Sequence, residues 1–421
     1  MGFEPTVGLH PRRFSRPLQS TALPPIRGGA RPAPLRAGTV SSADVASYTP
    51  GARSVEGLTV RQPPRPLRRR ATAVERAKVP LRPSLGSGTS PRMNRPGRRS
   101  VLALSAMSAG GTVLPGAVRA QEGTFEAFLD GLRAEARGAG ISPATLTRAL
   151  SGVRPNDRVV ELDRRQPEST LTWETYRDRI VSQARIDNGR RAHADNRPLL
   201  DTLQERYRVP GRVVVAIWGM ETNYGTNTGG FGVMEALATL AWEGRRAAYF
   251  RGELLSALRI LEAGHVTPAR MRGSWAGAMG QPQFMPSSFE RLAVDADGDG
   301  RKDIWDNRAD ALGSIANYLA RSGWREEERW GREVRLPDGF DTAVATRENV
   351  RPLREWAAQG LAFPDGTSVP DSDMGAAVVI PGVATGSRQA FLVYGNFNAI
   401  RRYNPSNFYA LAVGLLSDRV A

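Results

Sequence analysis

The chain has 421 residues, with 58 Lys and Arg against 42 Asp and Glu, so its formal net charge is +16. It contains no cysteine, which excludes disulfides, thiol catalysis, cysteine-based metal sites and a lipid-modified cysteine. Residues 1–120 hold 20 basic and 4 acidic residues, whereas residues 121–421 hold 38 of each. The part of the chain that is expected to fold therefore has no excess of basic residues, and we expect no nucleic-acid partner.

The N-terminal part of the chain is predicted to lie outside the folded domain. Residues 1–92 are crowded with Pro, Arg, Gly and Ser without a helix or strand period, which predicts a disordered or wrongly assigned extension. Residues 93–120 resemble a signal peptide: a basic MNRPGRRS, an apolar stretch, and small residues before Gln121. The pair Arg98 and Arg99 favours the twin-arginine route. A DNA- or RNA-binding protein stays possible only if this basic segment is retained.

Residues 121–421 are predicted to form a mainly α (α+β) domain. Apolar residues three and four apart begin at Phe125, and the helical pattern continues to Leu203. Further helices are expected at about 232–242, 244–263, 307–321 and 405–416. Between 324 and 400, the segments EVRLP, AAVVIP and QAFLVYG are typical of short strands, which predicts a small β-containing element near the C-terminus. No apolar run after Gln121 approaches the roughly 18 residues of a transmembrane helix, so we expect a soluble periplasmic product.

Glu221 is the strongest candidate for chemistry. It follows the unbroken apolar run from Val213 to Met220, which predicts a buried helix with a carboxylate near its C-terminal end. Burial disfavours the charged form of a carboxyl group and raises its pKa, so Glu221 is expected to donate a proton near neutral pH. The glycines that follow, at 225, 229, 230 and 232, would let a sugar chain approach the backbone. The alternative is a glutamate that ends a core helix in a buried ion pair.

The segment DADGDGRKDIWD predicts a cation site. Asp295, Asp297 and Asp299 occupy alternate positions with Gly300 at the turn, as in an EF-hand calcium loop. Arg301 would supply its carbonyl, and Asp306 stands at the twelfth position. The ion would be calcium or sodium with a structural role, and we expect no cofactor for catalysis. The alternative is an acidic turn without a metal.

Several long strings resemble the membrane-bound lytic transglycosylase B family. They are IWGMETNYG, ALATLAWEGRRAAYFRGEL, GSWAGAMGQPQFMPSSF, VDADGDG and GNFNAIRRYNPSNFYALAVGLL, in the family's order, and the likeness covers roughly residues 120–416. The resemblance implies a lysozyme-like helical catalytic domain in residues 121–421. It also implies peptidoglycan as substrate, with cleavage of the β-1,4 bond between N-acetylmuramic acid (MurNAc) and N-acetylglucosamine (GlcNAc) and formation of 1,6-anhydroMurNAc ends.

The resemblance also assigns roles to individual residues. Glu221 matches the catalytic acid/base, and Asp310 matches a late aspartate of the cation loop. The implied substrate-binding residues are Ser274, Gln283, Tyr403, Asn404, Tyr409, Arg245 and Arg246. Of these, the two arginines match a basic pair that meets the acidic peptide stems or lactyl groups. The chain departs from the family at Gln281 and Pro282, where Tyr-Gly is common.

A single carboxylate suits a reaction in which the substrate provides its own nucleophile. Ordinary glycosidases need a second carboxylate, and the Glu221 motif contains none, although Glu235, Glu243 or a distant aspartate could fold into reach. Two alternatives remain: a hydrolytic muramidase, and a non-catalytic peptidoglycan-binding protein. We expect the protein to act as a monomer.

Overall fold

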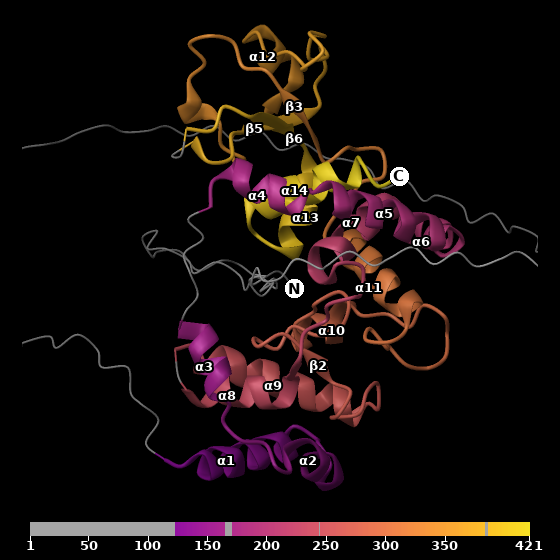
Figure 1. Cartoon of the computed structure of the whole chain (residues 1–421), viewed down its shortest axis with the longest axis vertical. Helices are drawn as coiled ribbons and strands as arrows, with labels where there is room; N and C mark the ends of the chain where they lie inside the picture. The colour runs from indigo at the N-terminus through magenta and orange to yellow at the C-terminus, as the bar shows by residue number, and fades with distance from the viewer. Residues whose placement is uncertain (1–122, 165–170, 244, 384–385) are drawn as a thin grey trace, which may run out of the picture. The chain divides into compact units, whose positions relative to one another are not determined.

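The computed structural model describes residues 123–164, 171–243, 245–383 and 386–421 (Figure 1). The predictions for residues 1–92 and for the signal peptide at 93–120 lie outside these ranges. The helices are α1 (Phe125–Gly138), α2 (Pro143–Leu150), α3 (Asp157–Arg164), α4 (Trp173–Ile180), α5 (Gln183–Asp195), α6 (Arg197–Tyr207), α7 (Gly211–Thr222), α8 (Val233–Glu243), α9 (Ala247–Glu262), α10 (Pro286–Leu292), α11 (Arg308–Arg321), η1 (Thr342–Val344), α12 (Leu353–Ala358), α13 (Gly395–Tyr403) and α14 (Asn407–Ser417). The strands are β1 (Phe231–Gly232), β2 (Arg272–Gly273), β3 (Gly331–Val334), β4 (Arg351–Pro352), β5 (Gly375–Val379) and β6 (Ala390–Val393).

The predicted helices are confirmed, and their starts follow from local chemistry. Thr124 caps α1 by accepting a hydrogen bond from the backbone N–H of Ala127. Ser142 caps α2 in the same way, and Pro143 occupies the first helical position, where its missing N–H costs nothing. The apolar positions of α1 that the 3.6-residue period selected are all buried.

Helix α7 is apolar on every side and is enclosed by other helices. Its residues from Val213 to Met220 are buried, and α5, α6, α11 and α14 pack against it. The helix ends where Asn223 adopts a left-handed conformation, with φ of 49°. The predicted buried helix is therefore confirmed, and its one acidic residue, Glu221, lies in its last turn.

The predicted strands are also confirmed, in a small antiparallel sheet with the order β3-β6-β5-β4. Gly331 pairs with Val393 and Ala377 pairs with Val393 from the other side, so β6 lies in the middle of the sheet. Helix α12, which the sequence did not predict, follows β4 directly and buries Trp356 in the core beside this sheet. A second, two-stranded ladder, β1-β2, pairs Phe231 with Gly273.

The buried apolar residues form three clusters. One surrounds α7 and α14, the second joins α1 and α2 to α8 and α9, and the third lies under the β3–β6 sheet. Tyr403 packs against both helical clusters. Among the described residues, no helix is both long enough and apolar enough to cross a membrane.

Replacing Gly414 tests how closely α14 packs against Trp330. A Cβ atom at this position would overlap the ring of Trp330, whose indole N–H donates to Asp418 at 3.0 Å. We expect Gly414→Ala to lower the free energy of unfolding by about 1–3 kcal/mol, because an overfilled core displaces its neighbours.

Urea denaturation measures this change. The matched control is Gly252→Ala in α9, where a Cβ would have nothing within 4 Å. This control is expected to be neutral or stabilising by up to about 1 kcal/mol, since alanine favours helix. If the two substitutions changed the free energy of unfolding equally, the contact between Gly414 and Trp330 would not be important for the packing of α14.

Candidate active site

Glu221 is held by a tyrosine that is distant in sequence. The hydroxyl of Tyr409, at the start of α14, donates a hydrogen bond of 2.6 Å to Glu221 Oε1. Tyr409 is 5% exposed, whereas Glu221 is half-buried. Burial, and then the charge of Glu221, raises the pKa of Tyr409 well above 10. The tyrosine is therefore protonated at neutral pH and acts as a hydrogen-bond donor there.

Three more tyrosines lie within electrostatic reach of Glu221. Burial first, with the charge of Glu221 contributing, raises the pKa of Tyr176, Tyr318 and Tyr403. The rings of Tyr318 and Tyr403 are 4.5 Å apart, and the Tyr403 hydroxyl donates to the carbonyl of Pro282 at 2.5 Å. The sequence analysis selected Tyr403 and Tyr409 but missed Tyr176 and Tyr318, which come from α4 and α11.

The turn after Glu221 is locked in an unusual backbone conformation. Asn223 and Tyr224 have φ values of 49° and 62°, a region that non-glycine residues rarely adopt. The Tyr224 hydroxyl donates to the carbonyl of Arg185 on α5 at 2.8 Å. A Cβ at Gly219 would lie 2.5 Å from the Tyr224 ring, so only glycine leaves room for it. This packing fixes the end of α7 and with it the direction of Glu221.

Two of the glycines predicted to admit a sugar chain have an internal role. Gly229 has a φ of 91°, and a Cβ on it would overlap the backbone of Gly273. A Cβ at Gly225 would lie 2.8 Å from Gln281 Oε1. These glycines let the loop after α7 approach the 273–281 segment closely.

Gln281, at the departure from the family pattern, connects that segment to α7. Its side chain accepts from the indole N–H of Trp218 at 3.0 Å and donates to the carbonyl of Trp305 at 3.0 Å. Its backbone carbonyl accepts from the Thr222 hydroxyl at 2.9 Å. Gln281 is 8% exposed, so it acts as a buried bridge, a role that sequence reasoning missed.

Ser274, Gln283 and Asn404 all stabilise turns. The Ser274 hydroxyl accepts from the backbone N–H of Ala278 at 3.1 Å. The Gln283 amide donates to the carbonyls of Thr228 and Gly280, at 3.0 and 2.8 Å, and so ties the loop after α7 to the Gly280 turn. Asn404 Oδ1 accepts from the backbone N–H of Ser406 at 3.1 Å. Their predicted contacts with substrate remain predictions.

Arg245 and Arg246 share one buried carboxylate. Arg245 contacts Asp163 Oδ2 at 2.8 and 3.1 Å, and Arg246 contacts Asp163 Oδ1 at 3.2 Å. Arg246 also lies over the Phe250 ring, 4.9 Å from its centroid. Asp163 was not singled out from the sequence. These residues belong to α3 and the α8–α9 connection, and the tyrosines around Glu221 come from other helices.

The two acidic residues that could have provided a second catalytic carboxylate have other partners. Glu235 Oε1 accepts from the side-chain amide of Asn156 at 3.1 Å. Glu243 pairs with Arg164. Glu221 is instead the carboxylate whose charge acts on the four tyrosines. The arrangement suits chemistry in which one carboxyl group gives and takes a proton.

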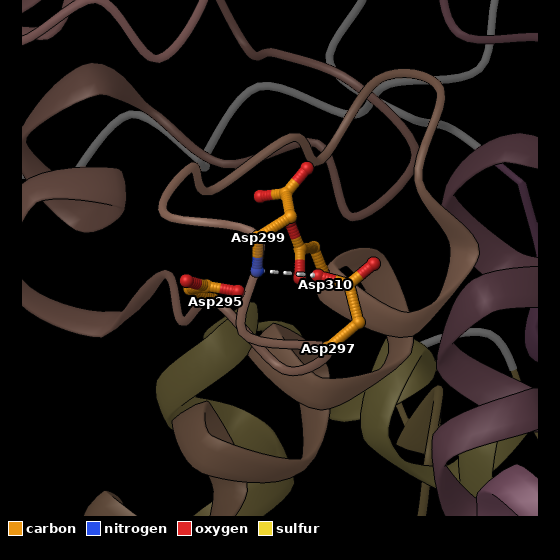
Figure 2. Close-up of side chains that lie close together, drawn as sticks. All are labelled: Asp295, Asp297, Asp299 and Asp310. Carbon is orange, nitrogen blue, oxygen red and sulfur yellow. Dashed lines mark hydrogen bonds between the residues drawn. The ribbon is translucent and has the colours of Figure 1, made fainter.

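Four of the predicted cation ligands converge. Asp295, Asp297, Asp299 and Asp310 each offer an oxygen atom within 4.8 Å of the others, and Figure 2 shows Asp310 reaching the loop from α11. Burial, and then the charges of Asp297 and Asp295, raises the pKa of Asp310. Arg301 pairs with one of these carboxylates, Asp299, at 3.9 Å. A cluster of four carboxylate oxygens fits a hard cation such as calcium.

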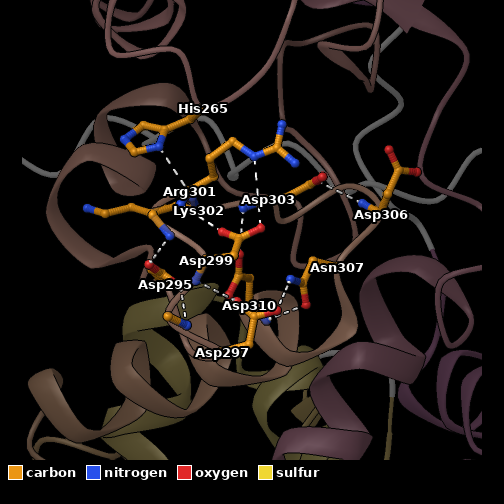
Figure 3. A network of polar contacts seen from close by, with 12 residues as sticks. His265, Asp295, Asp297, Asp299, Arg301, Lys302, Asp303, Asp306, Asn307 and Asp310 are labelled. Carbon is orange, nitrogen blue, oxygen red and sulfur yellow. Dashed lines mark hydrogen bonds and ion pairs between the residues drawn. The ribbon is translucent and has the colours of Figure 1, made fainter.

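Of the other two predicted ligands, Asp306 pairs with Arg270. Arg301 donates its backbone N–H to Asp299 at 2.8 Å, and the role predicted for its carbonyl stays a prediction. Figure 3 shows Asp306 turned away from the carboxylates that gather around Asp299. Asp303, which the sequence analysis missed, orders this part of the loop: it is 7% exposed and its backbone N–H donates to Asp310 at 2.7 Å.

Comparison with known proteins places the chain in a family. Residues 124–418 match the model of the transglycosylase SLT domain, and the chain belongs to this family. It is 34% identical over 301 residues to membrane-bound lytic murein transglycosylase B of Escherichia coli (strain K12), a match that covers 67% of this chain and 79% of that protein. The predicted family, the mainly helical lysozyme-like fold class and the lytic murein transglycosylase enzyme class are therefore confirmed.

Solved structures of lytic transglycosylases are also similar to this chain. SltB3 from Pseudomonas aeruginosa in complex with NAG-anhNAM-pentapeptide is 46% identical, with a TM-score of 0.68, and the match covers 70% of this chain and 79% of that one. The Escherichia coli lytic transglycosylase Slt35 in complex with calcium is 31% identical, with a TM-score of 0.59, and the match covers 70% of this chain and 92% of that one.

The Tyr409–Glu221 hydrogen bond can be tested by Tyr409→Phe, which keeps the ring and removes the donor. We expect kcat on peptidoglycan strands to fall roughly 10- to 100-fold, as when a hydrogen bond to a charged group is lost. The thermal unfolding midpoint should fall by only a few degrees, because the ring still fills its site and the lost hydrogen bond is worth about 1–2 kcal/mol.

Tyr207→Phe is the matched control. The Tyr207 hydroxyl is buried with no hydrogen-bond partner among the described residues, so its removal should leave kcat unchanged. If Tyr409→Phe retained full kcat, the tyrosine would have no part in positioning Glu221.

Proposed function

We propose that this enzyme cleaves the β-1,4 bond between MurNAc and GlcNAc in peptidoglycan strands and leaves 1,6-anhydroMurNAc ends. One observation carries the proposal: the carboxyl group of Glu221 lies at the end of a buried helix and accepts a hydrogen bond from the buried Tyr409 hydroxyl. The relative SltB3, which binds NAG-anhNAM-pentapeptide, supports the same product chemistry.

The proposed reaction has two proton transfers at one residue. Protonated Glu221 gives its proton to the bridging glycosidic oxygen as the bond to C1 of MurNAc breaks, and GlcNAc leaves as an alcohol. The MurNAc acetamido oxygen stabilises the positive charge that develops at C1. The C6 hydroxyl then attacks C1 and Glu221 takes its proton, which restores the acid. An intramolecular attack has an effective molarity of about 10⁵ M or more, so it outcompetes water.

The predicted substrate-binding residues support this reaction. Tyr403 and Asn404 stand at the end of α13, and Tyr409 stands at the start of α14. Tyr403 and Asn404 would offer an aromatic face and an amide group to the sugar and its acetamido substituents, and buried Tyr409 would hold Glu221. Ser274 and Gln283 would hold the turns at residues 274–278 and 280–283 in the shape that the substrate meets.

Replacing Glu221 tests the catalytic assignment. We expect Glu221→Gln to reduce cleavage by about 10²- to 10⁴-fold, the usual contribution of a general acid/base. Mass spectrometry of digested sacculi should find anhydroMurNAc ends with the parent enzyme.

Glu205→Gln, on the exposed face of α6, is the matched control and should keep full activity. Reducing MurNAc ends from the parent would instead identify a hydrolytic muramidase. Binding without cleavage by the parent would identify a peptidoglycan-binding protein that lacks turnover.

We also propose that Asp295, Asp297, Asp299 and Asp310 hold a structural calcium ion. The oxygen-only donor set and the crowding of negative charge around buried Asp310 support this assignment. The related Slt35 structure in complex with calcium supports it further. When bound, the ion would offset about half of the negative charge of the four carboxylates and fix the loop that precedes α11.

Calcium removal should therefore lower stability without changing the chemistry. We expect a chelator to lower the thermal midpoint by about 5–10 °C and added calcium to restore it, because a ligand that binds only the folded state stabilises that state. Asp310→Asn should abolish the calcium response. Asp306→Asn should retain it, because Asp306 pairs with Arg270, and loss of the response in this variant would return Asp306 to the ligand set.

Finally, we propose that the protein is exported to the periplasm as a monomer. The basic and apolar segment at residues 93–120 supports the export to the periplasm. N-terminal sequencing of the exported protein should begin at Gln121, and replacing both Arg98 and Arg99 by lysine should block export. A mature chain that retained residues 1–120 would contradict the proposal.

A further inference from the structure

Helix α7 has no polar face that could fix its rotation about its own axis. Its residues from Val213 to Met220 are all buried. Hydrophobic contacts depend little on direction, whereas a hydrogen bond restricts both the distance and the angle between two groups. The hydrogen bonds of the last turn of α7 therefore bear directly on the direction in which Glu221 points.

Gln281 binds two residues on one face of that turn. Trp218 and Thr222 are four positions apart, so their side chains lie on the same side of the helix. The Trp218 indole N–H donates to Gln281 Oε1 at 3.0 Å, and the Thr222 hydroxyl donates to the Gln281 carbonyl at 2.9 Å. Trp218 and Thr222 are 3% and 1% exposed, so water does not compete for these bonds.

Gln281 is also held on its other side. Its backbone N–H donates to the carbonyl of Ile304 at 2.9 Å, and its side-chain amide donates to the carbonyl of Trp305 at 3.0 Å. The backbone N–H, the backbone carbonyl and both ends of the side-chain amide of Gln281 thus have partners. A side chain that is bonded at both ends has little rotamer freedom, so Gln281 connects α7 firmly to the 304–305 segment.

Glu221 lies between Trp218 and Thr222 in the chain but faces another direction. Successive residues of a helix differ by about 100° in direction, and Glu221 accepts a hydrogen bond of 2.6 Å from Tyr409 on α14. Gln281 thus holds one side of the turn, while Tyr409 binds the acid on another side. A displacement of the turn by about 1 Å would lengthen the bond to Tyr409, and a misplacement of that size can reduce a rate about 10²-fold.

We propose that Gln281 is a positioning residue for the reaction: it holds the last turn of α7 in the orientation in which Glu221 meets both Tyr409 and the glycosidic oxygen. This inference rests on the proposed function, in which Glu221 exchanges the proton. Gln281 is 8% exposed and acts through Trp218 and Thr222. Its contribution therefore belongs to kcat rather than to the binding of the strand.

Gln281→Met tests this assignment, because methionine has nearly the same length and lacks the amide group. We expect kcat on peptidoglycan strands to fall about tenfold while KM changes by less than about twofold, as for a misplaced acid. The thermal unfolding midpoint should also fall by a few degrees, because the buried Trp218 indole loses its acceptor.

Trp356→Phe is the matched control for the loss of stability. The Trp356 indole N–H also donates a buried hydrogen bond, to the carbonyl of Ala376 at 2.9 Å, in the apolar cluster under the β3–β6 sheet. This variant should lower the unfolding midpoint but leave kcat unchanged. If it lowered kcat as much as Gln281→Met does, the effect would follow from stability alone and the inference would be wrong.

A double variant tests whether Gln281 acts on the bond between Tyr409 and Glu221. If Gln281 directs Glu221 toward Tyr409, the losses in kcat from Gln281→Met and Tyr409→Phe should not multiply, so the double variant should lose clearly less than their product. Losses that multiply fully would show that the two residues act independently and would overturn the inference. Full kcat in Gln281→Met, with a lowered unfolding midpoint, would assign Gln281 a purely structural role and would overturn it as well.

If Gln281→Met does not fold, Trp218→Phe removes the same hydrogen bond from the α7 side. It should lower kcat with little change in KM, and full kcat in this variant would contradict the inference. The parent enzyme separates this inference from the proposed function. A parent that forms anhydroMurNAc ends leaves the proposed function intact whatever the variants show, whereas a parent that does not cleave the strands would contradict both.

Discussion

The site depends on one hydrogen bond between residues that are 188 positions apart, from Tyr409 to Glu221. A half-buried carboxyl group at the end of an apolar helix loses part of its hydration, and a hydrogen-bond donor compensates for that loss. The tyrosine hydroxyl supplies one donor without adding a competing charge. It can do so because α14 packs directly against α7, so the fold of the C-terminal segment determines the environment of the acid.

A second constraint acts on the backbone around Glu221. Asn223 and Tyr224 are consecutive non-glycine residues in the left-handed region, and this backbone conformation is unfavourable by of order 1–3 kcal/mol for each residue. Such strain persists only where the surrounding packing holds the residue in place. Here Tyr224 fills the space left by Gly219, and Gln281 ties Trp218 to the neighbouring loop. The acid is therefore presented by a rigid turn rather than by a mobile side chain on a free helix end.

The charged clusters lie on separate elements. Asp295, Asp297 and Asp299 belong to the loop before α11, and Asp310 joins them from the first turn of that helix. The arginine pair around Asp163 joins α3 to the α8–α9 connection and presents positive charge outward. The proposed acid/base residue, Glu221, therefore lies on a different helix from Asp163 and the arginines that it binds.

The sequence by itself determined the periodic features: the buried helix ending in Glu221, the capped helices, the short strands and the alternating aspartates. These follow from local spacing and from residue chemistry, which act within a few positions of the chain. Tertiary structure alone decided that Asp163 would bind both arginines, that Asp310 rather than Asp306 would join the carboxylate cluster, and that Tyr176 and Tyr318 would lie within reach of Glu221. Each of these pairings brings together residues from separate helices or loops, and their contact depends on how those elements pack, which no local pattern encodes.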